Sequence, residues 1–163
     1  MPAAASNLDR TICELGLEDI ERIAAIDRAL SGRSRRRFYE TRLAAARERP
    51  QEFIHIGAMR GGVLRGFVFA RILSGEFGHA QSVAMLDAIG VEPHSQRLGV
   101  GQELMEDLVR RARARGVKTL QSQANWTSHS LLRFFEMSHF HLAARSALDR
   151  SVARPLVEAG EEV

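Results

Sequence analysis

The chain has 163 residues, of which 45% are hydrophobic and 26% charged, and its formal net charge at pH 7 is +3. This composition is typical of one soluble domain with a sizeable core, and no run approaches the roughly 18 apolar residues that a membrane span needs. With no secretory signal and a single cysteine, Cys13, we expect one cytoplasmic domain over residues 1–163, with a core at about 11–152 and loose termini at 1–8 and 153–163.

The first half of the chain predicts one strand, two helices and a strand hairpin. The expected elements are a strand at 11–15, helices at 17–30 and about 35–49, and strands at 53–59 and 63–73. Pro50 stops the second helix, which is rich in arginine. The pair Gly61-Gly62 between the two later strands is typical of a hairpin turn.

The second half predicts a buried central strand followed by a long amphipathic helix. The expected elements are a strand at 85–91, a helix at 102–115, a strand at 117–124, a helix at 127–137 and a strand-like segment at 141–152. The order indicates an α/β fold. Apolar residues alternate along 144–152, so we expect an edge strand that pairs with a partner chain and makes the protein a homodimer.

Between the central strand and the long helix, residues 96–101 read Gln-Arg-Leu-Gly-Val-Gly. The first N–H groups of a helix lack partners and attract anions, and Gly99 and Gly101 leave room for a phosphate beside the backbone. The spacing lacks the third glycine of a dinucleotide-binding loop and the Lys-Ser or Lys-Thr of a P-loop. The segment therefore predicts either a phosphate cradle of another kind or a simple turn.

Several motifs resemble those of the GNAT acyltransferase superfamily. They are the acyl-CoA loop Q/R-x-x-G-x-G/A at 96–101, the V-x-P strand exit at 91–93, the G-f-i-x-A strand at 66–70 and the frame F-Y-x-x-x-G-F at 134–140. The resemblance extends over about 11–152. It implies the GNAT fold, which is α/β with a mixed central sheet, a splayed central strand pair and flanking helices.

The same resemblance implies an activity and a set of binding residues. GNAT enzymes move an acetyl group from acetyl-CoA to a primary amine, here one of a small molecule or peptide. The expected pyrophosphate contacts are Gln96, Arg97, Leu98, Gly99, Val100 and Gly101. The backbone of Ile89, Gly90 and Val91 is expected to pair with the pantetheine arm, and we expect a bulge at Gly90 to splay the strand from its neighbour.

The last motif departs from the family at two positions. Phe135 replaces a tyrosine whose hydroxyl often serves as a general acid toward the departing thiolate, and His139 replaces a glycine that forms a tight turn. Ser128 stands in the place of a frequent asparagine near the pantetheine arm. The resemblance therefore implies Ser128 and Phe135 as neighbours of the cofactor, with no phenol to act as acid.

Asp87 is the single ionisable residue of the central strand. Burial would raise its pKa and make it a candidate base for the attacking ammonium, directly or through water. The alternative is a structural carboxylate paired with an arginine or a backbone donor. His139 and His141 have no further ligands nearby in the sequence, so we expect no metal site.

Three functions fit these observations. The first is the acetyltransferase, the second a regulator of the same fold that binds acyl-CoA without turnover, and the third a basic nucleic-acid-binding module. The arginines lie among acidic neighbours and lack an aromatic series for stacking, which argues against the third. The basic cluster at 33–37 favours an acceptor that carries an acidic group.

Overall fold

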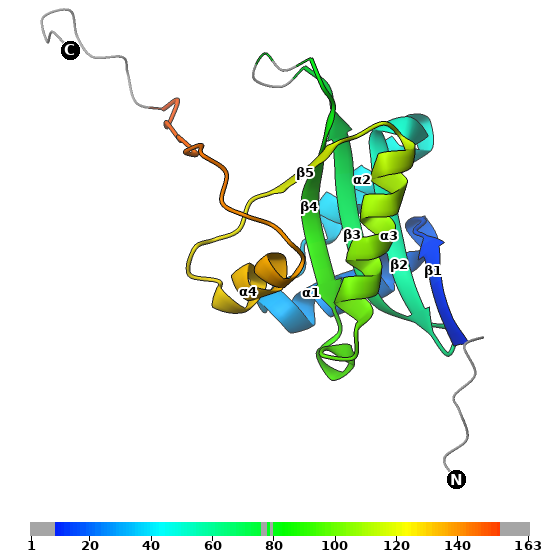
Figure 1. The fold of residues 1–163 in the computed structure, drawn as a ribbon. Helices are drawn as coiled ribbons and strands as arrows, with labels where there is room; N and C mark the ends of the chain where they lie inside the picture. The colour runs from blue at the N-terminus through cyan, green and yellow to red at the C-terminus, as the bar shows by residue number, and fades with distance from the viewer. Residues whose placement is uncertain (1–8, 76–77, 79, 154–163) are drawn as a thin grey trace, which may run out of the picture.

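The computed structural model describes residues 9–75, 78 and 80–153, and these fold around one mixed five-stranded sheet (Figure 1). The strands are β1 (Arg10–Glu14), β2 (Phe53–Arg60), β3 (Val63–Leu73), β4 (Val83–Val91) and β5 (Thr119–Ser122). They lie in the order β1-β2-β3-β4-β5, and neighbours are antiparallel except for the parallel pair β4 and β5. The sheet is thus the mixed sheet that the sequence predicted.

Helices cover both faces of the sheet. They are α1 (Ile20–Ser31), α2 (Arg36–Glu48), α3 (Val100–Ala114) and α4 (His129–Met137), with 3-10 turns at Leu17–Asp19, Pro50–Glu52 and Pro93–Ser95. Figure 1 shows α3 in front of the sheet and α1 and α2 behind it. Parallel strands cannot be joined by a hairpin and need a crossover connection. α3 forms the crossover between β4 and β5.

The core has two parts, one on each face. Alternating side chains of β2 and β3 face opposite helices, since successive residues of a strand point to opposite sides. The buried cluster on the α3 face includes Ile54, Ile56, Val68, Leu104 and Leu108. The cluster on the α1/α2 face includes Ile23, Ile26, Tyr39, Phe67 and Phe69. The sheet is therefore covered by apolar contacts on both sides.

β4 contains one extra residue relative to β3. Phe69 pairs with Ala88 and the next residue, Ala70, pairs with Leu86, so Asp87 has no partner of its own. Such an insertion is a β-bulge. It reverses the alternation of side chains, because Leu86 belongs to the α3-side cluster and Ala88 to the α1/α2-side cluster.

The bulge lies at Asp87, so the prediction of a bulge at Gly90 is wrong. Gly90 pairs in regular register with Phe67, and a side chain at Gly90 would meet the Phe67 ring at 2.7 Å. The glycine is needed for this close contact. The splayed strand pair itself is present, because β4 pairs with β5 only as far as Leu86, which faces Ser122.

The helices and the first four strands lie within a few residues of the predicted bounds, and the expected hairpin turn has positive φ angles of 56° and 73° at Gly61 and Gly62. β5 is shorter than the predicted 117–124. The prediction of a strand at 141–152 is wrong, since these residues form none and are exposed. A strand needs a neighbouring strand to be stable, and among the described residues this segment is not paired with one. The expected loose ends at 1–8 and 153–163 lie outside the described residues, except for Ala153.

Candidate active site

The loop between β4 and α3 presents a row of backbone amides without partners. Arg97 and Gly99 have left-handed backbones, with φ angles of 62° and 84°, and Gly99 caps the start of α3. Within the described chain, no oxygen accepts a hydrogen bond from the N–H groups of 97–102, and the first bond of the helix runs from the Glu103 amide to the Gly99 carbonyl at 3.0 Å. Unpaired amides at the positive end of a helix attract an anion.

Contacts on both sides hold this loop in place. The Gln96 side chain donates a hydrogen bond to the carbonyl oxygen of Val91 at 3.1 Å, which ties the loop to the end of β4. Val100 is buried in the α3-side core, whereas Leu98 is 66% exposed. A Cβ atom at Gly101 would stand 3.0 Å from the Phe134 ring of α4. The loop is thus bonded to the end of β4 on one side and lies close to α4 on the other.

Beside the loop, one edge of β4 has no neighbouring strand. β5 accompanies β4 only between Val83 and Leu86, so among the described residues the edge at 88–91 faces no other strand. An extended ligand can pair with such an edge as an added strand does. This edge includes Ile89, Gly90 and Val91, the residues at which the sequence predicts such a contact.

Asp87 lies directly after Leu86, where the open edge of β4 begins, and its side chain is on the α1/α2 side of the sheet. Arg71 of β3 donates two hydrogen bonds to its carboxylate, from Nε at 2.7 Å and Nη2 at 2.9 Å, and Nε of Arg42 in α2 lies 3.3 Å away. The side chain of Asp87 is 9% exposed. The structure therefore contains the arginine pairing that was one of the two interpretations of this residue.

Arg42 and Arg71 are not among the site residues predicted from the sequence, because each is far from Asp87 in the chain. The alternation of residues in β3 nevertheless indicates that Arg71 needs a partner. It shares one face of β3 with Phe67 and Phe69, and a charged residue at the end of an apolar face needs a partner of opposite charge.

A sequence model of the acetyltransferase (GNAT) family matches residues 17–140. The chain belongs to the GNAT acetyltransferase family. It is therefore an acyltransferase, and GNAT acetyltransferases use acetyl-CoA. No curated protein matches the chain.

Solved structures of N-acetyltransferases, and one of a transcriptional regulator, share this fold. An aminoglycoside N-acetyltransferase in complex with CoA is 18% identical with a TM-score of 0.73, and the match covers 93% of this chain and 99% of that one. A ribosomal-protein-alanine N-acetyltransferase from Brucella melitensis is 22% identical with a TM-score of 0.68, over 87% and 98% of the two chains. A transcriptional regulator from Bacillus halodurans is 19% identical with a TM-score of 0.72, over 87% and 99%. At these identities the similarity shows the fold alone.

Two further residues that the GNAT resemblance singled out lie on or before α4. Ser128 is half-buried and precedes the helix as its N-cap residue. Phe135 is buried in the α3-side core, and its ring centroid lies 4.9 Å from that of Phe140. No tyrosine hydroxyl lies in this part of the molecule. The single tyrosine of the chain, Tyr39, is buried on the opposite face of the sheet.

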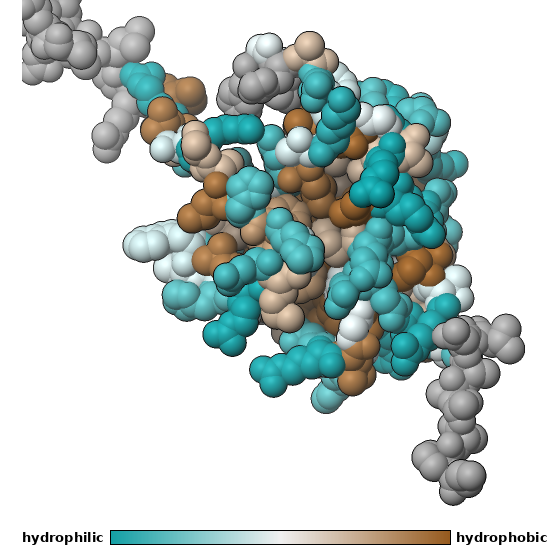
Figure 2. Space-filling model, in the orientation of Figure 1, coloured by the Kyte–Doolittle hydropathy of each residue, from teal (hydrophilic) through white to brown (hydrophobic). Residues whose placement is uncertain are grey.

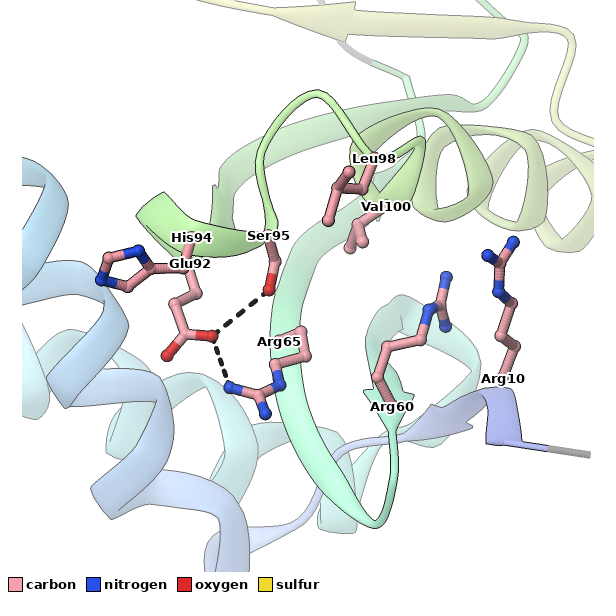
Figure 3. Close-up of a pocket in the computed structure, with 8 residues that line it drawn as sticks. All are labelled: Arg10, Arg60, Arg65, Glu92, His94, Ser95, Leu98 and Val100. Carbon is pink, nitrogen blue, oxygen red and sulfur yellow. Dashed lines mark hydrogen bonds and ion pairs between the residues drawn. The ribbon is translucent and has the colours of Figure 1, made fainter. Parts of the chain in front are cut away.

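A pocket of about 320 Å³ also borders the loop between β4 and α3 (Figure 3). Its lining residues are Arg10, Arg60, Arg65, Glu92, His94, Ser95, Leu98 and Val100. Glu92 accepts a hydrogen bond from Arg65 at 2.7 Å and another from Arg22, and these bonds lower the pKa of Glu92 to about 2. Glu92 is thus held between two arginines, which is typical of a structural ion-pair network.

In the part of the chain that the structure describes, no group of three His, Cys, Asp or Glu side chains is arranged to hold a metal ion. No helix among the described residues is long and apolar enough to cross a membrane.

Proposed function

We propose that this GNAT enzyme transfers the acetyl group of acetyl-CoA to a primary amine of a small molecule or peptide, and that it does so in the cytoplasm, which suits a chain with a single cysteine. The unpartnered amides of 97–102, next to the open edge of β4, are the observation that carries the proposal. A pyrophosphate supplies the hydrogen-bond acceptors that these amides lack. The amides of a pantetheine arm can pair with an open strand edge.

The residues present therefore fit acetyl-CoA. Gln96, Arg97, Leu98, Gly99, Val100 and Gly101 would hold the pyrophosphate, and Ile89, Gly90 and Val91 the pantetheine arm, with Ser128 and Phe135 on the side of α4. Bound acetyl-CoA supplies an activated acyl group. The protein then has to orient the amine and remove its proton, because a protonated amine has no lone pair with which to attack.

Asp87 is the proposed base, acting directly or through water. It stands at the bulge where the edge of β4 opens, and its carboxylate is held in place by Arg71. No acid is proposed at Phe135. A free thiol has a pKa of about 8.5, so a thiolate leaves readily near neutral pH without one.

Substitution of Gly99 tests the binding of CoA. Gly99 has a φ of 84°, and a branched side chain there strains the turn and blocks the approach of a phosphate. We expect Gly99→Val to weaken CoA binding by about tenfold or more in calorimetry. Gly116→Val is the matched control, because Gly116 has a φ of 77° at the far end of α3 and is equally free of neighbours. Equal losses of affinity in both variants would assign the effect to backbone strain and contradict the loop as the CoA site.

The second candidate function is a regulator that binds acyl-CoA without turnover, and the phenylalanine at position 135 is the observation that favours it. An assay of thiol release with acetyl-CoA and a panel of amines separates the two. Release that depends on an amine supports the transferase. Binding of CoA with no release from any amine supports the regulator.

We also propose that two copies form a homodimer through residues 141–152. Leu142, Leu148 and Val152 in this segment are each more than nine-tenths exposed. Figure 2 shows hydrophobic side chains along the segment that extends from α4. β5 has strand β4 on one side only, so its outer edge offers a place for an added strand.

A further inference from the structure

The pocket beside the loop between β4 and α3 has basic walls (Figure 3). Arg10, Arg60 and Arg65 come from the neighbouring strands β1, β2 and β3. Their side chains are 59%, 19% and 34% exposed, so a ligand in solvent can reach all three. Leu98 and Val100 belong to the pocket as well as to the loop, so the pocket adjoins the proposed pyrophosphate site.

Arg10 and Arg60 share the carboxylate of Glu103 in the first turn of α3. Arg60 donates a hydrogen bond to this carboxylate and another, at 2.8 Å, to the carbonyl oxygen of Met59. Arg10 approaches the carboxylate only to 3.8 Å, and none of the described residues accepts a hydrogen bond from its guanidinium group. The N–H donors of Arg10 are therefore available to a ligand.

Glu92 is shared between two arginines in the same way. It accepts a hydrogen bond from Arg65 at 2.7 Å and one from Arg22, and these bonds lower its pKa to about 2, so that it is ionised at pH 7. His94, the remaining titratable residue of the lining, carries no negative charge in either protonation state. Residues 1–8 contain no Asp or Glu that could add a carboxylate to this end of the sheet.

The four arginines of this site thus face two carboxylates, which leaves two positive charges without a counter-charge among the described residues. A phosphate monoester carries about 1.5 to 2 negative charges at pH 7 and offers three acceptor oxygens. A carboxylate would balance a single charge. Guanidinium groups bind phosphate through paired hydrogen bonds, so the charges and donors of the pocket favour a phosphate monoester. The pocket volume of about 320 Å³ suits a small ligand.

The pocket and the open edge at 88–91 lie on opposite sides of β4. That edge faces away from β3, whereas the pocket is lined by residues of β1, β2 and β3. The groups of CoA follow one another in the order pantetheine arm, pyrophosphate, and adenosine with its 3′-phosphate. A CoA molecule with the first group on the open edge and the second on the loop therefore has its third group beyond the loop, on the side of the pocket.

We propose that Arg10 and Arg60 bind the 3′-phosphate of CoA in this pocket. The inference rests on the proposed function and adds a side-chain site to the backbone contacts of the loop. Leu98, which is 66% exposed, gives the adenosine an apolar surface to pack against. The enzyme would thus distinguish CoA from a cofactor that lacks this phosphate.

Calorimetry with CoA and 3′-dephospho-CoA tests the proposal, because the two compounds differ by this phosphate alone. At one fixed ionic strength, we expect the wild-type protein to bind CoA about tenfold or more tightly, as charged hydrogen bonds imply. Arg10→Gln should weaken CoA binding by a similar factor and leave the affinity for dephospho-CoA unchanged. Arg60→Gln, with circular dichroism as the control for folding, should change the two affinities in the same way. Arg113→Gln removes the same charge from an exposed site near the C-terminal end of α3 and should leave both affinities unchanged.

The outcomes separate this inference from the proposed function. Equal affinities of the wild-type protein for the two compounds, or equal losses for both in Arg10→Gln, overturn the phosphate site while CoA binding at the loop stands. Absence of binding of both compounds contradicts the proposed function. In that case adenosine 3′,5′-bisphosphate and adenosine 5′-phosphate are titrated into the wild-type protein and Arg10→Gln. Binding of the bisphosphate alone, lost in the variant, supports the 3′-phosphate site, and any other result overturns it.

Discussion

Two guanidinium groups surround Asp87, and this contact limits what its carboxylate can do. Arg71 uses both oxygens, so an incoming ammonium must share the lone pairs that remain. The same contact fixes the direction of the carboxylate, which is what a base needs in order to meet its proton at hydrogen-bond distance. A held carboxylate is therefore compatible with both a structural and a catalytic role, and the two roles predict different kinetics.

Asp87→Asn distinguishes these roles. The amide keeps the size of the side chain and loses the charge, so we expect kcat to fall by about 10²-fold or more if Asp87 removes the proton. Raising the pH should restore part of the rate, because more of the acceptor is then unprotonated without help. Steady-state kinetics over a range of pH measure this, with CoA affinity and circular dichroism as controls for folding. Full activity at every pH would make the carboxylate structural.

Among the helices and strands, the C-terminal end of α4 forms a tight turn with a histidine in the place of the usual glycine. The amide of Phe140 bonds to the Phe135 carbonyl at 2.9 Å and that of His139 to the Glu136 carbonyl at 3.0 Å. The rings of Phe135 and Phe140 make the apolar contact that accompanies this Schellman pattern. His139 takes the left-handed position, with a φ of 64°. The tight turn is therefore present although His139 stands in the place of the family's glycine.

Because a left-handed backbone is unfavourable for a residue with a Cβ atom, His139→Gly should stabilise the protein. We expect a gain of about 1 kcal/mol in the free energy of unfolding, measured by urea denaturation. His141→Gly, two residues later in the exposed segment, should give no gain and controls for the loss of an imidazole. A lower stability of the His139→Gly variant would show that the side chain makes a contribution larger than the strain.

The sequence predicted the elements and the loop because their signals are local. Hydrophobic periodicity marks a helix or strand within its own length, and Gly99 lies in the loop that it shapes. The bulge at Asp87 and the pairing with Arg42 and Arg71 depend on residues from three separate elements, so no single window of sequence contains them. The strand expected at 141–152 has the right alternation, but alternation does not supply the neighbouring edge that a strand needs.

The whole molecule exposes an apolar C-terminal segment, and we expect light scattering at micromolar concentration to give the mass of a dimer. Leu148→Lys places a charge in the proposed interface and should shift the protein toward the monomer. Val63→Lys is the control, since Val63 is also an exposed apolar residue but lies at the hairpin between β2 and β3. A monomeric wild-type protein at these concentrations would rule the interface out.

The bulge of β4 depends on the number of residues in the strand and not on the identity of their side chains. The open edge at 88–91 begins at this bulge. Substitutions at Asp87 change chemistry but keep the extra residue, so Leu86 and Ile89 still face α3 and the edge at 88–91 stays open. Deletion of one residue here would remove the bulge, so Leu86 and Ile89 would still face α3 but the strand would lose the local bend and twist that a bulge produces. We expect a straighter β4 to run beside the chain after β5 for a longer distance, which would narrow the open edge at 88–91. The open edge of β4 therefore depends more on the length of this strand than on the identity of its side chains.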